Sequence, residues 1–171
     1  FSPLVLERGY DVDVRHEAGE RFWRTGVLDV RSNVQFGEGG AGTFSDGKLT
    51  TRIGDPLMRM VTDALIAAGA PEEIRCLQKP HVGTDLLRGI VKNIREEIRR
   101  LGGEIRFAAQ VTDIELKDGA VRALIVNAEE RVETEAAFFA IGHSARDTYE
   151  MLLSRGLFLE AKAFAVGVRI E

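Results

Sequence analysis

Leu4-Val5-Leu6-Glu7-Arg8-Gly9 gives the first indication of the fold class. Three consecutive apolar residues that end in charged residues and a glycine predict a short buried strand of a parallel sheet. The next segment, residues 11–24, is polar with apolar positions at a helical spacing, and Gly26 closes it. A buried strand that leads at once into a helix is typical of α/β proteins.

The elements expected beyond this first strand and helix extend the α/β pattern. They are, in chain order, a helix opened by Asp55-Pro56 and ended by Gly69, a helix from Thr84 to Leu101, a strand over 104–107, a hairpin of strands 111–116 and 121–126 around Asp118-Gly119, a strand at Val132, an apolar strand over 136–141, and a helix over 145–155 capped by Ser144. We therefore expect a parallel sheet with an inserted antiparallel piece.

Composition and charge exclude several classes of protein. The chain has 171 residues, of which 44% are hydrophobic, and a net charge of −4. This length can bury a core without disulfides, and the charge offers no basic surface for nucleic acid. Cys76 stands alone, which suits a reducing cytoplasm, and we expect it to be buried rather than nucleophilic. The apolar run 136–141 is far shorter than the ~20 residues of a membrane helix. We expect a cytoplasmic protein without a membrane partner.

Five of the chain's 18 glycines fall in one loop, Gly37-Glu38-Gly39-Gly40-Ala41-Gly42-Thr43-Phe44-Ser45-Asp46-Gly47-Lys48-Leu49-Thr50. Residues 37–42 match the dinucleotide pattern G-x-G-x-x-G, and residues 42–48 match the Walker pattern G-x-x-x-x-G-K. Each pattern must open a helix, and no helical period begins before Asp55. Leu49 also stands where a Walker loop needs Ser or Thr for magnesium. Both matches are therefore interpreted as accidental.

The glycine loop keeps two readings open. Clustered glycines permit positive φ angles and a close approach of the backbone, so successive N–H groups can converge on a phosphate, aided by Thr43, Ser45 and Lys48. A flexible surface turn would have the same composition. Glu7 also has two readings: it is either the acid that accepts hydrogen bonds from ribose hydroxyls at a strand end, or a plain strand-ending carboxylate.

The three histidines are candidates of unequal interest. His16 lies in a polar helix and is expected to be solvated, whereas His81 precedes a helix and can face a ligand or help to cap it. His143 follows the apolar strand 136–141, at the end of a strand where ligands of α/β sheets bind. No grouping of His, Cys and carboxylates has the spacing of metal ligands, so we expect no metal site.

Four segments together resemble a known family: residues 4–9, residues 33–49, Gly83-Thr84-Asp85 and residues 140–147. The chain is similar over essentially its whole length to the bacterial uncharacterised FAD-dependent dehydrogenases. These are a branch of the glutathione-reductase-type flavoproteins, similar to the aminoacetone-oxidase-like group. The resemblance implies a Rossmann-like FAD/NAD(P)-binding sheet with an antiparallel hairpin insertion and a helical insertion on the substrate side, incomplete at both ends.

The resemblance also implies which residues hold FAD. Glu7 would bind the adenosine ribose with Arg8 beside it near the adenine, and the backbone of Val111 would meet the adenine. The pyrophosphate, ribityl and flavin-ring region would be lined by Gly39, Gly40, Ala41, Gly42, Thr43, Ser45, Asp46, Gly47 and Lys48. Ala140, Ile141, Gly142 and His143 would form a second contact, usually written Ala-Thr-Gly in the family, where isoleucine here removes a hydroxyl. Lys48 and His143 are the candidate polar groups near the flavin ring.

The implied organisation is a partial FAD-binding domain (1–51), a helical insertion (52–82), a continuation of the FAD-binding domain (83–150) and the start of a substrate-side domain (151–171). The upstream G-x-G-x-x-G and a downstream Gly-Asp segment of the family are missing, so we expect an internal fragment. The expected function is that of an FAD-dependent oxidoreductase acting on an unknown small molecule, with NAD(P)H as a candidate partner. The alternatives are a non-catalytic nucleotide-binding or interaction module and, more weakly, a phosphate-binding NTPase. Oligomeric state is not encoded in these patterns.

Overall fold

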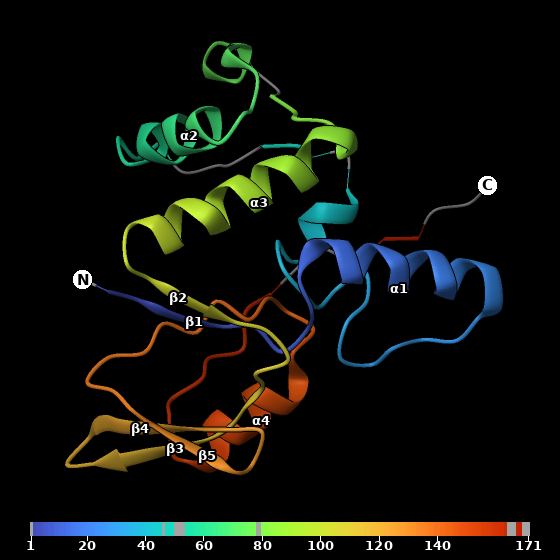
Figure 1. The fold of residues 1–171 in the computed structure, drawn as a ribbon. Coiled ribbons are helices and arrows are strands. Elements are labelled where there is room, and N and C mark those ends of the chain that lie inside the picture. The colour runs from blue at the N-terminus through green and yellow to red at the C-terminus, as the bar shows by residue number, and fades with distance from the viewer. Residues whose placement is uncertain (1, 46, 50–53, 78–79, 164–166, 169–171) are drawn as a thin grey trace. The chain divides into compact units, whose positions relative to one another are not determined.

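The computed structural model describes residues 2–45, 47–49, 54–77, 80–163 and 167–168. The chain forms two compact units, residues 1–111 and residues 112–171. The first holds a two-stranded parallel sheet and the second a three-stranded antiparallel sheet (Figure 1). The predicted mixture of helices with a parallel sheet and an antiparallel hairpin is confirmed at this level. The four-part domain division stays a prediction.

The parallel sheet of the first unit joins two segments far apart in the sequence. Strand β1 (Leu4–Leu6) pairs with β2 (Glu104–Arg106) so that Leu4 lies opposite Glu104 and Leu6 opposite Arg106. Helix α3 (Thr84–Arg100) leads into β2. The tight connection requires Gly103, because a methyl group there would lie 2.7 Å from Ile98 Cγ2. The predicted 84–101 helix and the predicted parallel strand at residues 4–6 are thereby confirmed. The prediction that this strand is buried is wrong, since Leu4 and Leu6 are only partly buried and Val5 is 38% exposed.

Two further helices complete the first unit. Helix α1 (Val12–Thr25) lies in the predicted segment 11–24; Asp11 is its N-cap, and it ends at the predicted Gly26, with φ +72°. Helix α2 (Met58–Ala67) begins later than the predicted Asp55-Pro56 start, because the Asp55 carboxylate accepts the N–H of Leu57 in a preceding turn. The short 3₁₀ helix η2 (Glu72–Arg75) follows. The buried core beneath α2 and α3 consists of Ala68, Ala70, Ile74, Val82 and Ile90.

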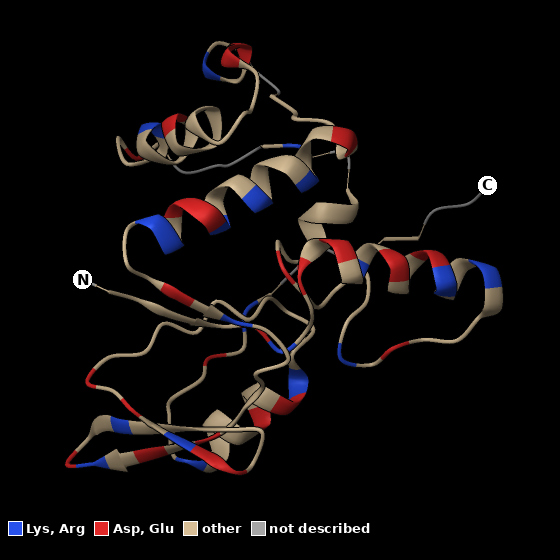
Figure 2. Ribbon diagram, viewed as in Figure 1, with Lys and Arg blue, Asp and Glu red and all other residues tan. Residues whose placement is uncertain are grey.

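Charged residues join α1 to α3. Figure 2 shows both signs of charge interspersed along these two helices. Asp13 of α1 pairs with Arg88 (3.1 Å) and Lys92 (2.6 Å) of α3. The hydrogen bond from Lys92 is the largest effect and lowers the pKa of the Asp13 carboxyl; burial opposes it, and the hydrogen bond from Arg88 lowers the pKa further. Because these side chains are about two-fifths exposed, the pairs orient the helices more than they stabilise them.

The second unit is built on the predicted hairpin. Strands β3 (Val111–Lys117), β4 (Ala120–Val126) and β5 (Glu130–Glu133) lie in that order. Asp118 and Gly119 both have positive φ (+55° and +75°), as a two-residue type I′ turn requires. Helix α4 (Arg146–Ser154) follows, and Arg155 at its end forms two hydrogen bonds with the Asp113 carboxylate of β3. The Asp-Gly hairpin prediction is confirmed.

The predicted apolar strand 136–141 is wrong. This segment is irregular, and Phe138 within it is 97% exposed. A strand needs a neighbour with which to exchange backbone hydrogen bonds, and the described sheet of this unit ends at β5. At the start of the segment, the Thr134 hydroxyl donates to the carbonyl of Ala136 and accepts its N–H. These local hydrogen bonds take the place of backbone hydrogen bonds to a neighbouring strand.

Two smaller expectations are also wrong. Ser144 does not cap α4: Ala145 occupies the N-cap, and Ser144 Oγ lies 3.3 Å from Nε2 of His143 instead. Cys76 is exposed, not buried, because it directly follows η2 on the surface.

No helix among the described residues combines the length and the apolar character that a membrane crossing requires.

Candidate functional site

The carboxylate of Glu7 joins the end of β1 to the glycine loop. Glu7 Oε1 accepts hydrogen bonds from the N–H of Gly9 (2.8 Å) and from the N–H of Gly37 (3.1 Å), 30 residues away. Oε2 accepts no hydrogen bond from any residue that the structure describes. Glu7 is also fixed through its backbone, since its N–H donates to Arg106 and its carbonyl accepts from Ala109. One carboxylate oxygen is therefore used structurally and the other is available to a ligand.

Gly9 and Gly37 make the closest backbone approach at this site. A methyl group on Gly9 would lie 2.6 Å from the α-carbon of Gly37 and 2.7 Å from its nitrogen. The next residues continue the contact, because the N–H of Glu38 donates to the carbonyl of Tyr10 (3.0 Å). Only glycine permits this approach, so Gly9 is required by packing.

Arg15 of α1 holds the glycine loop from beneath. The side chain is fully buried (0% exposed). Its Nε donates to the carbonyl of Asn33 and its Nη1 to the carbonyl of Glu38, both at 2.7 Å. The guanidinium also lies over the Phe44 ring, 4.8 Å from the ring centre. Gly37 has φ +117° and no room for a side chain, because Arg15 Cδ would lie 2.5 Å from a methyl group there.

The guanidinium of Arg15 is not fully satisfied. Its Nη2 is buried without a hydrogen-bond partner in the part of the chain that the structure describes. Burial lowers the pKa of Arg15 to about 10, while the nearby charges of Glu7 and Glu38 act in the opposite direction. Arg15 remains charged at neutral pH, so it places a fixed positive charge beneath the loop.

Glu38 ties the loop to two helices. Its Oε2 accepts from the N–H of Val12, the first residue of α1 (2.8 Å), and from Nη1 of Arg95 on α3 (2.9 Å). The N-cap Asp11 occupies the next N–H groups of α1. The N-terminus of α1 is thus filled by the protein's own carboxylates and does not bind a phosphate. Burial raises the pKa of Glu38, although the Val12 N–H and Arg95 oppose the rise.

The raised pKa of Glu38 predicts a pH dependence of stability. Between its unfolded and folded pKa values, the folded state binds more protons than the unfolded state. The contribution of Glu38 to the free energy of unfolding therefore falls as pH rises above its ordinary value of 4.5. Urea unfolding from pH 4.5 to 8 is expected to show the wild type losing stability relative to Glu38→Gln as pH rises. A difference that is constant or grows in favour of the wild type contradicts the assignment.

The loop backbone is shaped by glycines in the left-handed region. Gly39 and Gly40 have φ +81° and +62° and lead into the 3₁₀ helix η1 (Ala41–Phe44). Thr43, which is buried, donates its hydroxyl to the carbonyl of Glu38 (3.3 Å). Gly42 differs from its neighbours: its φ is not positive, and a methyl group there would meet nothing within 4 Å. Neither backbone strain nor the described neighbours require glycine at this position.

The structure bears out the rejection of both accidental motifs. Residues 37–42 open a four-residue 3₁₀ helix and not the α-helix that a dinucleotide fingerprint needs. In the described residues that follow Gly47, neither Lys48 nor Leu49 is helical, and Lys48 pairs with His81 in an isolated antiparallel bridge. Ser45 and Gly47 hold this end of the loop, since Ser45 Oγ accepts the N–H of Gly47 (3.1 Å). Asp46 lies outside the described residues.

The remaining candidate residues fall into two groups. Arg8 follows Glu7 and lies over the ring of Phe36, 4.7 Å from its centre, and Val111 opens β3. The other group belongs to the second unit, in the irregular segment before α4: Ala140, Ile141, Gly142 and His143. The first unit therefore brings Glu7, Arg8 and the glycine loop together. The contribution of residues 140–143 stays a prediction.

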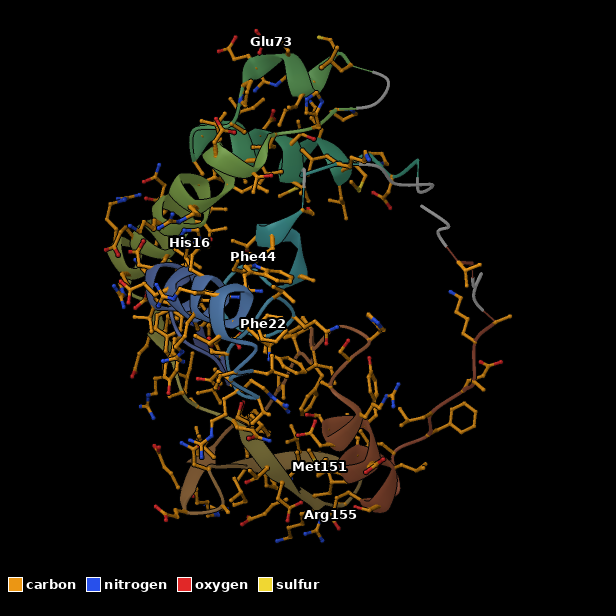
Figure 3. All side chains as sticks on the ribbon, turned by 90° about the vertical axis from the view of Figure 1, so that its right-hand side faces the viewer. His16, Phe22, Phe44, Glu73, Met151 and Arg155 are labelled. Atoms are coloured by element: carbon orange, nitrogen blue, oxygen red, sulfur yellow. The ribbon has the colours of Figure 1, made fainter. Side chains whose placement is uncertain are left out.

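The histidine predictions have mixed outcomes. His16 is half-buried and stacks on Phe44, with ring centres 6.5 Å apart, so the expectation of a solvated side chain is wrong (Figure 3). His81 does not cap α3, whose N-cap is Gly83. His143 is exposed.

The buried charges of Arg15 and Glu38 and the partly buried charge of Arg95 were not predicted from the sequence. A signal existed for Arg15, because it shares a helix face with the buried residues Val12 and Ala18 at spacings of three. Glu38 carried no such signal, since only the folded loop brings it beside Arg95.

Comparisons with known proteins give one relative and no family. No family model matches the chain. The chain is 58% identical over its full 171 residues to a protein from Clostridium beijerinckii named "Uncharacterized protein". It spans 32% of that protein's length.

Proposed function

We propose that this chain holds FAD in an oxidoreductase of the dehydrogenase type, within a Rossmann-like FAD-binding domain. One observation carries the proposal: the carboxylate at the end of a parallel strand is hydrogen bonded to the glycine loop, through Glu7 Oε1 and the N–H of Gly37 (3.1 Å). Ligands of α/β proteins bind at the carboxyl ends of parallel strands, where an acid accepts hydrogen bonds from ribose hydroxyls.

The residues present fit the two polar parts of FAD. Glu7 Oε2, which accepts no hydrogen bond within the described structure, supplies an acceptor for the ribose hydroxyls. Gly40 and Gly42 border open space, so the phosphates and the ribityl chain can approach the loop backbone. The buried charge of Arg15 beneath the loop favours an anionic ligand.

The chain's own role in this function is to bind and orient. The flavin, when bound, supplies the transfer of hydride or electrons. Glu7 and the glycine loop hold the nucleotide, and Arg15, Glu38 and Arg95 keep the loop in shape. Lys48, at the far end of the loop from Gly37, is the candidate polar group near the flavin ring.

A flavin absorption spectrum of the full-length protein tests the proposal. The purified protein is expected to be yellow, or to become so when FAD is added and excess is removed. A colourless protein that takes up no FAD contradicts the enzyme function. The alternative, a non-catalytic nucleotide-binding module, is then favoured if the same protein binds ADP.

Gly42→Ala is expected to weaken FAD binding by about tenfold, or roughly 1.4 kcal/mol. The reason is that the added methyl group occupies space that the chain itself leaves open and that the ligand would use. Because φ at Gly42 is ordinary, the free energy of unfolding should not fall. Fluorescence titration of FAD and urea unfolding measure the two quantities.

Gly89→Ala is the matched control. Gly89 also has an ordinary φ, and a methyl group there would meet nothing within 4 Å, but it belongs to α3 and not to the loop. Alanine there is expected to stabilise the fold by roughly 0.5–1 kcal/mol and to leave FAD affinity unchanged. Equal FAD affinity in the Gly42 variant and the wild type would mean that the ligand does not pack on this part of the loop.

A further inference from the structure

Lys48 and His81 are brought together by the fold from positions 33 residues apart. The N–H of Val82 donates to the carbonyl of Gly47 (3.0 Å), and the N–H of Leu49 donates to the carbonyl of Pro80 (2.8 Å). These two hydrogen bonds flank the antiparallel bridge between Lys48 and His81. They make Lys48 and His81 a non-hydrogen-bonded pair, the closer of the two kinds of antiparallel pair, with α-carbons about 4.5 Å apart.

The side chains of this Lys48–His81 pair point to the same, outer face. Side chains directly opposite in an antiparallel pair lie on one side of the ribbon, and their neighbours lie on the other. Of their neighbours, Val82 belongs to the buried core of the first unit, and Leu49 packs against that core. Lys48 and His81 are both exposed, as this alternation requires.

The rest of the fold holds the pair in place. The core contacts of Val82 anchor one segment, and the hydroxyl of Thr84 donates to the carbonyl of Ser45 (2.8 Å) across the two segments. Gly47 permits the approach, because its φ is +69° and a methyl group there would lie 3.0 Å from Leu87 Cδ1. The backbone of the pair is thus fixed before any ligand binds, which reduces the entropy cost of bringing the two residues together.

The chemistry of the pair is that of an oxyanion site. Lys48 supplies an ammonium group, and the imidazole of His81 supplies an N–H donor beside it. The pair also lies beyond the part of the glycine loop that is hydrogen bonded to Glu7.

We propose that Lys48 and His81 together bind the carboxylate of a small organic acid, the substrate of the flavoprotein. This assignment rests on the proposed function, which puts the nucleotide at the Glu7 end of the loop and the flavin ring toward Lys48. It adds a substrate class, and it gives His81, whose position in the sequence already allowed it to face a ligand, a specific binding role that the resemblance did not assign.

Histidine NMR tests the site without FAD. Imidazole resonances of the full-length protein are recorded while succinate is added at constant ionic strength, and His81→Gln identifies the His81 signals. Those signals are expected to shift in a saturable way, while those of His16, which is stacked on Phe44, stay unchanged. Lys48→Met is expected to weaken the succinate affinity at least fivefold. Lys117→Met, which removes an exposed lysine from the second unit, should leave it unchanged.

Three outcomes overturn the assignment. The first is an absence of saturable shifts at His81. The second is a parallel, unsaturated drift of all histidines, which indicates non-specific ion effects. The third is saturation with inorganic pyrophosphate but not with succinate, which would make the pair part of the cofactor phosphate site. The flavin absorption spectrum tests the proposed function independently of succinate binding. A protein that takes up FAD but does not bind succinate therefore refutes the substrate site and leaves the proposed function intact.

Discussion

Arg15→Met is expected to lower the free energy of unfolding by roughly 3 kcal/mol, because it leaves buried polar groups without partners. The carbonyls of Asn33 and Glu38 each lose a donor at 2.7 Å, and Phe44 loses the guanidinium that lies over its ring. One term opposes this loss: the substitution removes a buried charge whose Nη2 has no described partner. The free energy lost by leaving two carbonyls unpaired and by removing the cation–π contact is larger than the free energy gained by removing the buried charge.

Urea unfolding of the Arg15 variants measures this effect. Arg15→Lys is expected to recover only a small part of the stability, because an ammonium group cannot reproduce the fork that reaches both carbonyls. Arg59→Met is the control, since the Arg59 side chain is 83% exposed and its substitution should change stability by about 0.5 kcal/mol or less. If Arg15→Met is no more destabilising than the Arg59 variant, Arg15 does not hold the loop.

Gly9→Ala is expected to destabilise the fold by about 3 kcal/mol and to weaken nucleotide binding at the same time. The added methyl group would lie 2.6 Å from the α-carbon of Gly37, and backbone atoms cannot move aside as a flexible side chain can. Relief of this clash must separate the loop from the strand end. That movement breaks the hydrogen bond from the N–H of Gly37 to Glu7.

Two measurements distinguish this effect from a general loss of stability. Urea unfolding gives the stability change, and FAD titration is done under conditions where the variant remains folded. Affinity is expected to fall because the Glu7 carboxylate is displaced relative to the loop. The Gly89→Ala control should raise the free energy of unfolding slightly or leave it unchanged, and it should not change the FAD affinity. A Gly9 variant with wild-type stability would show that the close approach is not required.

Local sequence patterns predicted most elements of the fold. Asp11 and Gly26 marked both ends of α1, Asp118-Gly119 marked the hairpin, and the run Leu4–Leu6 marked β1. These features succeed because a cap, a turn with positive φ and a short apolar run act over a few neighbouring residues. The run 136–141 failed because its apolar character says nothing about a partner strand, and the described sheet of its unit supplies none.

The mixed α/β class and the positive φ angles within the glycine loop follow from the sequence alone, because backbone conformation at glycines, caps and turns depends on local chemistry. Only the tertiary structure decided that Glu7 bonds to Gly37, that Arg15 is buried beneath the loop, and that His81 stands opposite Lys48. These contacts join residues 18 to 33 positions apart. They depend on how whole elements pack, which no local pattern specifies.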